Sequence, residues 1–159
     1  MTRKTPVSKG TAYDKLLDIL SYKDYSSQEV YDKLTAKGFP EHDAADAVAR
    51  AVGNGLIDDS RYAESVAARK MHSCGKRAVL FELKKRGIPL DLAEKTVDGL
   101  FEDFDVAADI LPEMRRRLKG QDIGDPKVRN RVFGAFSRHG YDFEDINKAF
   151  MLCKEEYED

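Results

Sequence analysis

The chain has 159 residues, of which 42% are hydrophobic and 35% are charged, and its net charge is −2. This length allows one ordinary domain or a few small modules, and the apolar content is enough for a core beneath a densely charged surface. The net charge argues against a strongly basic, histone-like DNA binder. No apolar run approaches the ~20 residues needed to cross a bilayer.

The first ten residues, 1–10, are basic and polar and have no apolar centre. A secretory signal needs such a centre, so we expect a short disordered arm here and a cytoplasmic protein. The two cysteines, Cys74 and Cys153, are far apart in the sequence. In a reducing compartment we expect no disulfide between them.

Helical spacing of apolar residues recurs along the whole chain, whereas strand-like alternation is nearly absent. Val106, Ile110, Met114 and Leu118, for example, are each four residues apart, which lays them on one face of a helix. The spacing predicts nine helices, near residues 11–23, 27–37, 41–53, 59–73, 76–86, 90–102, 103–119, 126–138 and 142–156.

Helix starts are marked by capping residues. Ser26 and Glu29 have the capping-box spacing, in which each side chain accepts a hydrogen bond from the other's backbone. Asp125 precedes Pro126, a residue suited to the first helical position. The acidic pair Asp58-Asp59 is interpreted as another helix start. Pro112 falls inside a predicted helix, where it either kinks the helix or marks its true start.

Three segments align without gaps, each with a base or His before a glycine and an apolar residue after it. They are Lys33–Phe39, Glu82–Ile88 and Ala135–Tyr141, and their glycines are 49 and 53 residues apart. A period of this size is typical of stacked helical units. We therefore predict an all-α protein made of three tandem three-helix repeats, at residues 11–57, 58–102 and 103–159, in an elongated, curved array.

Two stretches resemble the RecX family. The first runs from Tyr25-Ser-Ser-Gln-Glu-Val-Tyr-Asp-Lys-Leu34 through Lys37-Gly-Phe39 to Gly55-Leu-Ile-Asp-Asp-Ser-Arg-Tyr-Ala-Glu64, and the second from Gly75-Lys-Arg-Ala-Val-Leu-Phe-Glu-Leu83 to Ile88. The segment that begins at Gly55 is the most specific. The resemblance covers residues 12 to 101 well and the remainder loosely.

The resemblance implies three tandem three-helix repeats and a regulator of DNA repair, recombination and the SOS response. Such a protein binds within the groove of a RecA–DNA filament and suppresses ATP hydrolysis and strand exchange. The expected partner is the RecA filament, with single- or double-stranded DNA contacted weakly, and the protein is expected to be a monomer.

Bases are concentrated in two regions. Residues 69–86 carry seven bases and one acid, and residues 113–138 carry eight bases and three acids. Such regions can meet a phosphate row or an acidic partner. The candidate binding residues are Arg77, Phe81, Lys84, Lys85, Arg115, Arg116, Arg117, Lys127, Arg131 and Arg138.

Each candidate also has a simpler interpretation. A basic cluster can be a solvated helix face, and Phe81 can be a contact between modules rather than a stacking platform. Lys127, Arg131 and Arg138 fall within a ~40° arc of their helix, opposite apolar residues. At least one member of the Arg115–Arg117 run has to face solvent.

Residues for catalysis or cofactor binding are missing. His42, His72 and His139 lack metal-ligand spacing, and no glycine-rich phosphate loop is present. We expect no catalytic residue, no cofactor and no metal, and hence no enzyme. The competing interpretations are a sequence-independent DNA-binding protein that acts without a recombinase, and a helical-repeat adaptor for another protein.

Overall fold

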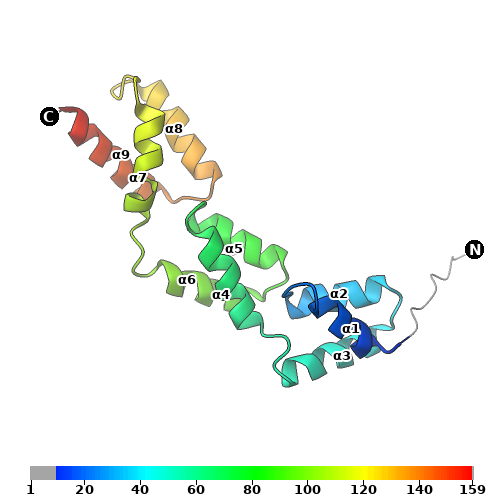
Figure 1. The fold of residues 1–159 in the computed structure, drawn as a ribbon. Helices are drawn as coiled ribbons and strands as arrows, with labels where there is room; N and C mark the ends of the chain where they lie inside the picture. Colours follow the sequence, from blue (N-terminus) through cyan, green and yellow to red (C-terminus); the bar gives the residue numbers. More distant parts are fainter. Residues whose placement is uncertain (1–9, 159) are drawn as a thin grey trace, which may run out of the picture. The chain divides into compact units, whose positions relative to one another are not determined.

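The computed structural model describes residues 10–158 and shows nine helices and no strand in that range (Figure 1). The all-helical prediction is therefore confirmed, whereas the arm expected at residues 1–10 lies, apart from Gly10, outside the described residues. The helices are α1 (Ala12–Leu20), α2 (Ser27–Ala36), α3 (Glu41–Gly53), α4 (Asp59–Lys70), α5 (Lys76–Lys85), α6 (Leu90–Phe101), α7 (Val106–Leu118), α8 (Pro126–Arg138) and α9 (Phe143–Glu158).

Helix starts follow the predicted caps. The Ser26 hydroxyl accepts from the Glu29 amide, and the Glu29 carboxylate accepts from the Ser26 amide, both at 3.1 Å. The Asp125 carboxylate accepts from the Lys127 amide at 2.8 Å, with Pro126 as the first residue of α8. These side chains satisfy amide groups that have no partner within the helix.

The start of α7 differs from the prediction because Asp105 caps it. The Asp105 carboxylate accepts from the Ala108 amide at 3.1 Å, so the helix begins at Val106 rather than at residue 103. Pro112 lies inside α7 and does not start it. With no amide hydrogen, it removes one main-chain hydrogen bond from the interior of the helix.

The three aligned glycines end their helices in the same way. Gly38, Gly87 and Gly140 have φ values of +95°, +79° and +85°, in the left-handed region that glycine adopts without strain. The residue after each glycine donates its amide to the carbonyl five residues earlier, at 3.1–3.3 Å. That apolar residue is buried in every case, as Phe39, Ile88 and Tyr141. This helix ending confirms the repeat.

The described chain divides into two compact units. One unit contains the residues up to Ser65 together with Leu83–Ala93, and the other contains Val66–Glu82 and the residues from Glu94 onward. In the first, α1, α2 and α3 pack on one another around Leu16, Val30 and Leu34. In the second, α7, α8 and α9 enclose Met114, Leu118, Ile146, Ala149 and Cys153. The repeat boundaries after residues 57 and 102, and the elongated, curved array, stay predictions.

Each unit contains a joint in which the start of one repeat's second helix meets the glycine turn of the next repeat. In the first unit the Ser26 hydroxyl donates to the Arg86 carbonyl at 2.5 Å, and a Cβ on Gly87 would lie 2.5 Å from the Gln28 Cβ. In the second, the Gly75 amide donates to the His139 carbonyl at 2.9 Å. The glycines are thus needed for close approach as well as for the turn.

The helices of residues 10–158 include none that is both long and apolar enough to span a bilayer.

Candidate partner-binding surfaces

Arg77, the first predicted binding residue, holds the turn between α8 and α9. Its guanidinium donates to the Tyr141 carbonyl at 2.9 Å and to the Ser137 carbonyl at 3.2 Å. It also lies 3.3 Å from the Asp142 carboxylate. Although the side chain is 57% exposed, these contacts engage it within the molecule, so its predicted role toward a partner stays a prediction.

Phe81, Lys84 and Lys85 are exposed residues of α5. The Phe81 ring is 67% exposed, which is unusual for a large aromatic residue of a helix and leaves its faces available to a partner. Lys84 and Lys85 are also exposed, and within residues 10–158 neither has a carboxylate at ion-pair distance. The buried side of the same helix is provided by Val79 and Leu83.

The run Arg115–Arg117 is largely neutralised by two glutamates. Arg115 pairs with Glu156 at 2.5 Å, and both Arg116 and Arg117 pair with Glu113, at 2.6 and 2.7 Å. Hydrogen bonds from the Arg116 guanidinium hold the pKa of Glu113 below its usual value, against a smaller opposing effect of burial. All three arginines therefore carry partners of opposite charge, which makes this run a weaker anion-binding candidate than its sequence indicates.

The α8 helix presents Lys127, Arg131 and Arg138 on its exposed side, as their spacing predicted. Its opposite side buries Val128, Val132, Phe133 and Phe136. Arg131 donates to the neutral Gln121 amide oxygen at 2.9 Å, which leaves its charge uncompensated. In the described part of the chain, no carboxylate lies at ion-pair distance from these three bases. They form the α8 basic face.

Residues of the segment from Gly55 to Glu64 make hydrogen bonds that stabilise the fold. The Asp58 carboxylate caps α4 by accepting from the Arg61 amide at 3.1 Å, as predicted. Asp59 instead accepts from the Ser27 amide at 2.8 Å, thirty-two residues earlier. The hydroxyl of buried Tyr62 accepts from the Arg86 guanidinium at 2.8 Å. Burial raises the pKa of Tyr62, and the hydrogen bond from Arg86 acts in the opposite direction.

One surface cluster was missed at the level of sequence. Tyr22 and Tyr25 follow α1, and the ammonium groups of Lys23 and Lys33 each lie 4.8 Å from the centre of the Tyr25 ring. The available signal was the alternation of aromatic and basic residues in Tyr22-Lys-Asp-Tyr25. That signal is weak, because Asp18 and Asp24 keep the local net charge low.

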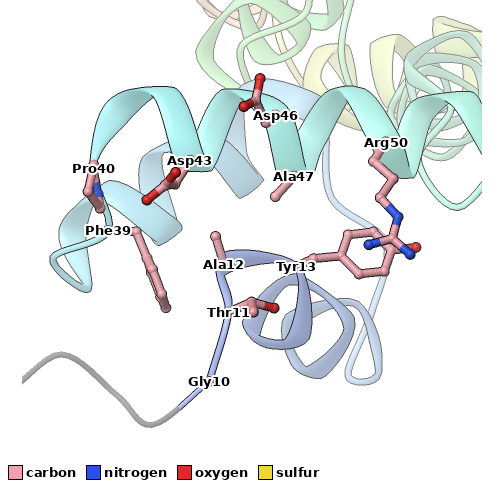
Figure 2. A pocket seen from close by; sticks show the side chains of 10 residues that line it. All are labelled: Gly10, Thr11, Ala12, Tyr13, Phe39, Pro40, Asp43, Asp46, Ala47 and Arg50. Atoms are coloured by element: carbon pink, nitrogen blue, oxygen red, sulfur yellow. The ribbon is translucent and has the colours of Figure 1, made fainter.

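A hollow of about 500 Å³ lies between α1 and α3 (Figure 2). Ala12, Ala47 and Phe39 form its apolar part, whereas Asp43 and Asp46 stand on α3 at its edge. The Arg50 guanidinium covers the Tyr13 ring at 3.9 Å (Figure 2). With two carboxylates at the edge and its aromatic face occupied, this hollow is unsuited to a phosphate-bearing partner.

Comparisons with known proteins agree on one family. The family model for the first three-helix domain of RecX matches residues 12–50, and the model for the second matches residues 58–97. The regulatory protein RecX of Mycolicibacterium smegmatis is 32% identical over 135 residues, covering 79% of this chain and 70% of that protein. The regulatory protein RecX of Trichlorobacter lovleyi is 30% identical, covering 87% and 92%.

The fold has a solved counterpart as well. The crystal structure of RecX from Lactobacillus salivarius superposes with a TM-score of 0.76, covering 90% of this chain and 94% of that chain at 22% identity. At that identity the match is one of fold, and it supports the arrangement as a helical repeat array.

Proposed function

The chain belongs to the RecX family, and from this premise we propose that it binds RecA filaments on DNA and restrains their ATP hydrolysis and strand exchange. The observation that carries the proposal is the match of two RecX domain models in tandem, over residues 12–50 and 58–97, the second of which begins within the Gly55–Glu64 stretch, at Asp58. The protein acts in the cytoplasm as a monomer, and its effect comes from binding rather than from catalysis.

The α8 basic face is the first contact that we assign to the filament. Its three charges are exposed and uncompensated within residues 10–158, so they can pair with a phosphate row or with carboxylates of a protein partner. Lys84 and Lys85, with the exposed ring of Phe81 in the same helix, are the second. Arg115–Arg117 rank lower, because an incoming anion has to displace Glu113 and Glu156.

The proposal is tested by adding the protein to a RecA–single-stranded DNA reaction. ATP hydrolysis and strand exchange should both fall at substoichiometric to equimolar ratios. The Glu triple Lys127→Glu, Arg131→Glu and Arg138→Glu should weaken inhibition about a hundredfold or more, at roughly 1 kcal/mol or more for each desolvated contact. A matched triple at Arg69, Lys95 and Lys119 changes the net charge equally and should inhibit normally.

Absence of any inhibition by the wild-type protein, over a wide concentration range with a cognate recombinase, would sink the proposal. Equal loss in both triples would show that only overall charge matters. The salt dependence of inhibition distinguishes contacts with DNA from contacts with protein, because binding through many phosphates weakens steeply with salt. Inhibition through protein contacts should keep much of its strength at a salt concentration that dissociates the protein from bare DNA.

A further inference from the structure

Two lysines converge on Tyr25 at the end of the first helix. The ammonium groups of Lys23 and Lys33 are each 4.8 Å from the ring centre, although the two residues belong to different segments. Lys23 lies in the turn after α1, whereas Lys33 lies in α2. Two like charges held near one ring repel each other, and an anion placed between them would relieve that repulsion.

The same ring lines a hollow of about 580 Å³, which is large enough to receive a nucleotide unit. Ile19 and Ala36 contribute apolar surface, and Tyr22, Lys33 and Lys37 stand around the hollow. Tyr22 is 81% exposed and lies in a turn. An aromatic ring that exposed provides a face on which another flat ring can stack.

Asp18 lines this hollow and is paired with Lys15 at 2.9 Å. Asp32 accepts from the neutral Gln28 amide at 2.9 Å and so keeps its charge, but neither Asp32 nor Asp24 lines the hollow. Within residues 10–158, no carboxylate lies at ion-pair distance from Lys23, Lys33 or Lys37. The net charge of the residues that line the hollow is therefore positive, because Lys33 and Lys37 add to the neutral pair of Lys15 and Asp18.

We infer that this Tyr–Lys hollow, lined by Tyr22, Tyr25, Lys33 and Lys37 with Lys23 beside it, binds single-stranded nucleic acid. One base stacks on Tyr22, and the flanking phosphates lie against the lysines. Exposed aromatic rings interleaved with bases are what a sequence-independent single-strand site requires. The inference goes beyond the proposed function, which places its contacts on α5 and α8 and assigns none of these residues.

A single strand fits the hollow better than the other anionic partners. In a duplex the faces of the bases are covered by their neighbours, so Tyr22 would have nothing to stack on. An acidic protein segment would satisfy the lysines but has no flat ring in each repeating unit. A ligand with both an uncovered base and phosphates can use the exposed tyrosine and the uncompensated lysines together.

The test measures binding of a fluorescent oligothymidylate to the full chain without recombinase, by anisotropy. Tyr22→Ala should weaken binding roughly tenfold, the range for one stacked base, and Tyr22→Phe should restore it. Lys33→Gln with Lys37→Gln should also weaken binding and make it less dependent on salt. Tyr157→Ala, which removes another exposed tyrosine, and Lys95→Gln with Lys119→Gln, which neutralise two exposed lysines elsewhere, are the controls.

An abasic strand with the same number of phosphates separates stacking from charge. The wild-type protein should bind it about as weakly as Tyr22→Ala binds oligothymidylate, and Tyr22→Ala should bind both strands alike. Equal binding of oligothymidylate by Tyr22→Ala and the wild type, or equally strong competition by polyglutamate, would overturn the inference.

Parallel inhibition assays distinguish this inference from the proposed function. A protein that inhibits RecA but does not bind the oligonucleotide would refute only the Tyr–Lys hollow. A protein that binds the oligonucleotide but leaves RecA unaffected would refute only the proposed function.

Discussion

The hydroxyl of Ser26 donates a hydrogen bond to the backbone carbonyl of Arg86, at 2.5 Å and sixty residues further along the chain. The second joint has the same plan, since Gly75 follows Ser26 by the same 49 residues that separate Gly87 from Gly38. There the Gly75 amide donates to the His139 carbonyl. In each compact unit, the start of one repeat's second helix is thus hydrogen-bonded to the glycine turn of the next repeat.

Ser26→Ala should destabilise the protein by about 1–3 kcal/mol, because it removes the cap of α2 and leaves the Arg86 carbonyl without its donor. Ser26 is fully buried, so water cannot readily replace the hydroxyl. Urea unfolding measures the change. Ser21→Ala, at an exposed serine whose hydroxyl donates to the Asp18 carbonyl, is the control and should stay within about 0.5 kcal/mol of the wild type.

Substitutions at two of the aligned glycines can separate the contribution of the turn to stability from that of close packing. Gly38→Ala should cost about 1–2 kcal/mol, because its φ is positive but its surroundings are open. Gly140→Ala should cost about 3 kcal/mol or more, since the new Cβ would also lie 2.5 Å from the Ala78 amide nitrogen. Equal losses of unfolding free energy in the two variants would contradict the close packing of Gly140 against Ala78.

Arg77→Gln should lower the unfolding free energy by about 1–2 kcal/mol, a value reduced for the exposure of the side chain. The loss comes from the Ser137 and Tyr141 carbonyls, which lose a charged donor. Lys84→Gln, in the same helix, should change stability by less than about 0.5 kcal/mol. Thermal unfolding of the two variants checks this difference. No destabilisation by Arg77→Gln would mean that these hydrogen bonds contribute nothing.

Two of the seven tyrosines, Tyr62 and Tyr141, have raised pKa values, and Tyr141 should ionise late in an alkaline titration. Burial, with smaller contributions from the nearby Cys74 and Asp109, raises the pKa of Tyr141 from 10.0 to about 12. The folded state therefore keeps a proton that the unfolded state releases, so stability is intact below pH 10 and is lost as the pH rises toward 12. Phenolate absorbance follows the titration, and Tyr141→Phe should remove its latest step.

Local chemistry in the sequence determined the helices, their caps and the three glycine turns. Ser26 with Glu29, Asp125 with Pro126 and Gly38 act on neighbours within five residues, so their effect can be inferred from spacing alone. The predicted start of α7, at residue 103, was wrong because the spacing of apolar residues did not distinguish the residues before Asp105 from those of the helix. The resemblance to RecX was likewise carried by contiguous residues.

Only the tertiary structure decided which bases are available to a partner. Arg77 is engaged by residues 60 to 65 positions away, and Arg115 by Glu156, 41 positions away, so no local pattern could separate them from Lys84 or Lys127. The convergence of Lys23 and Lys33 on Tyr25 likewise depends on how α2 packs beside α1. Charge is a property of the sequence, but whether it is compensated depends on contacts that only folding creates.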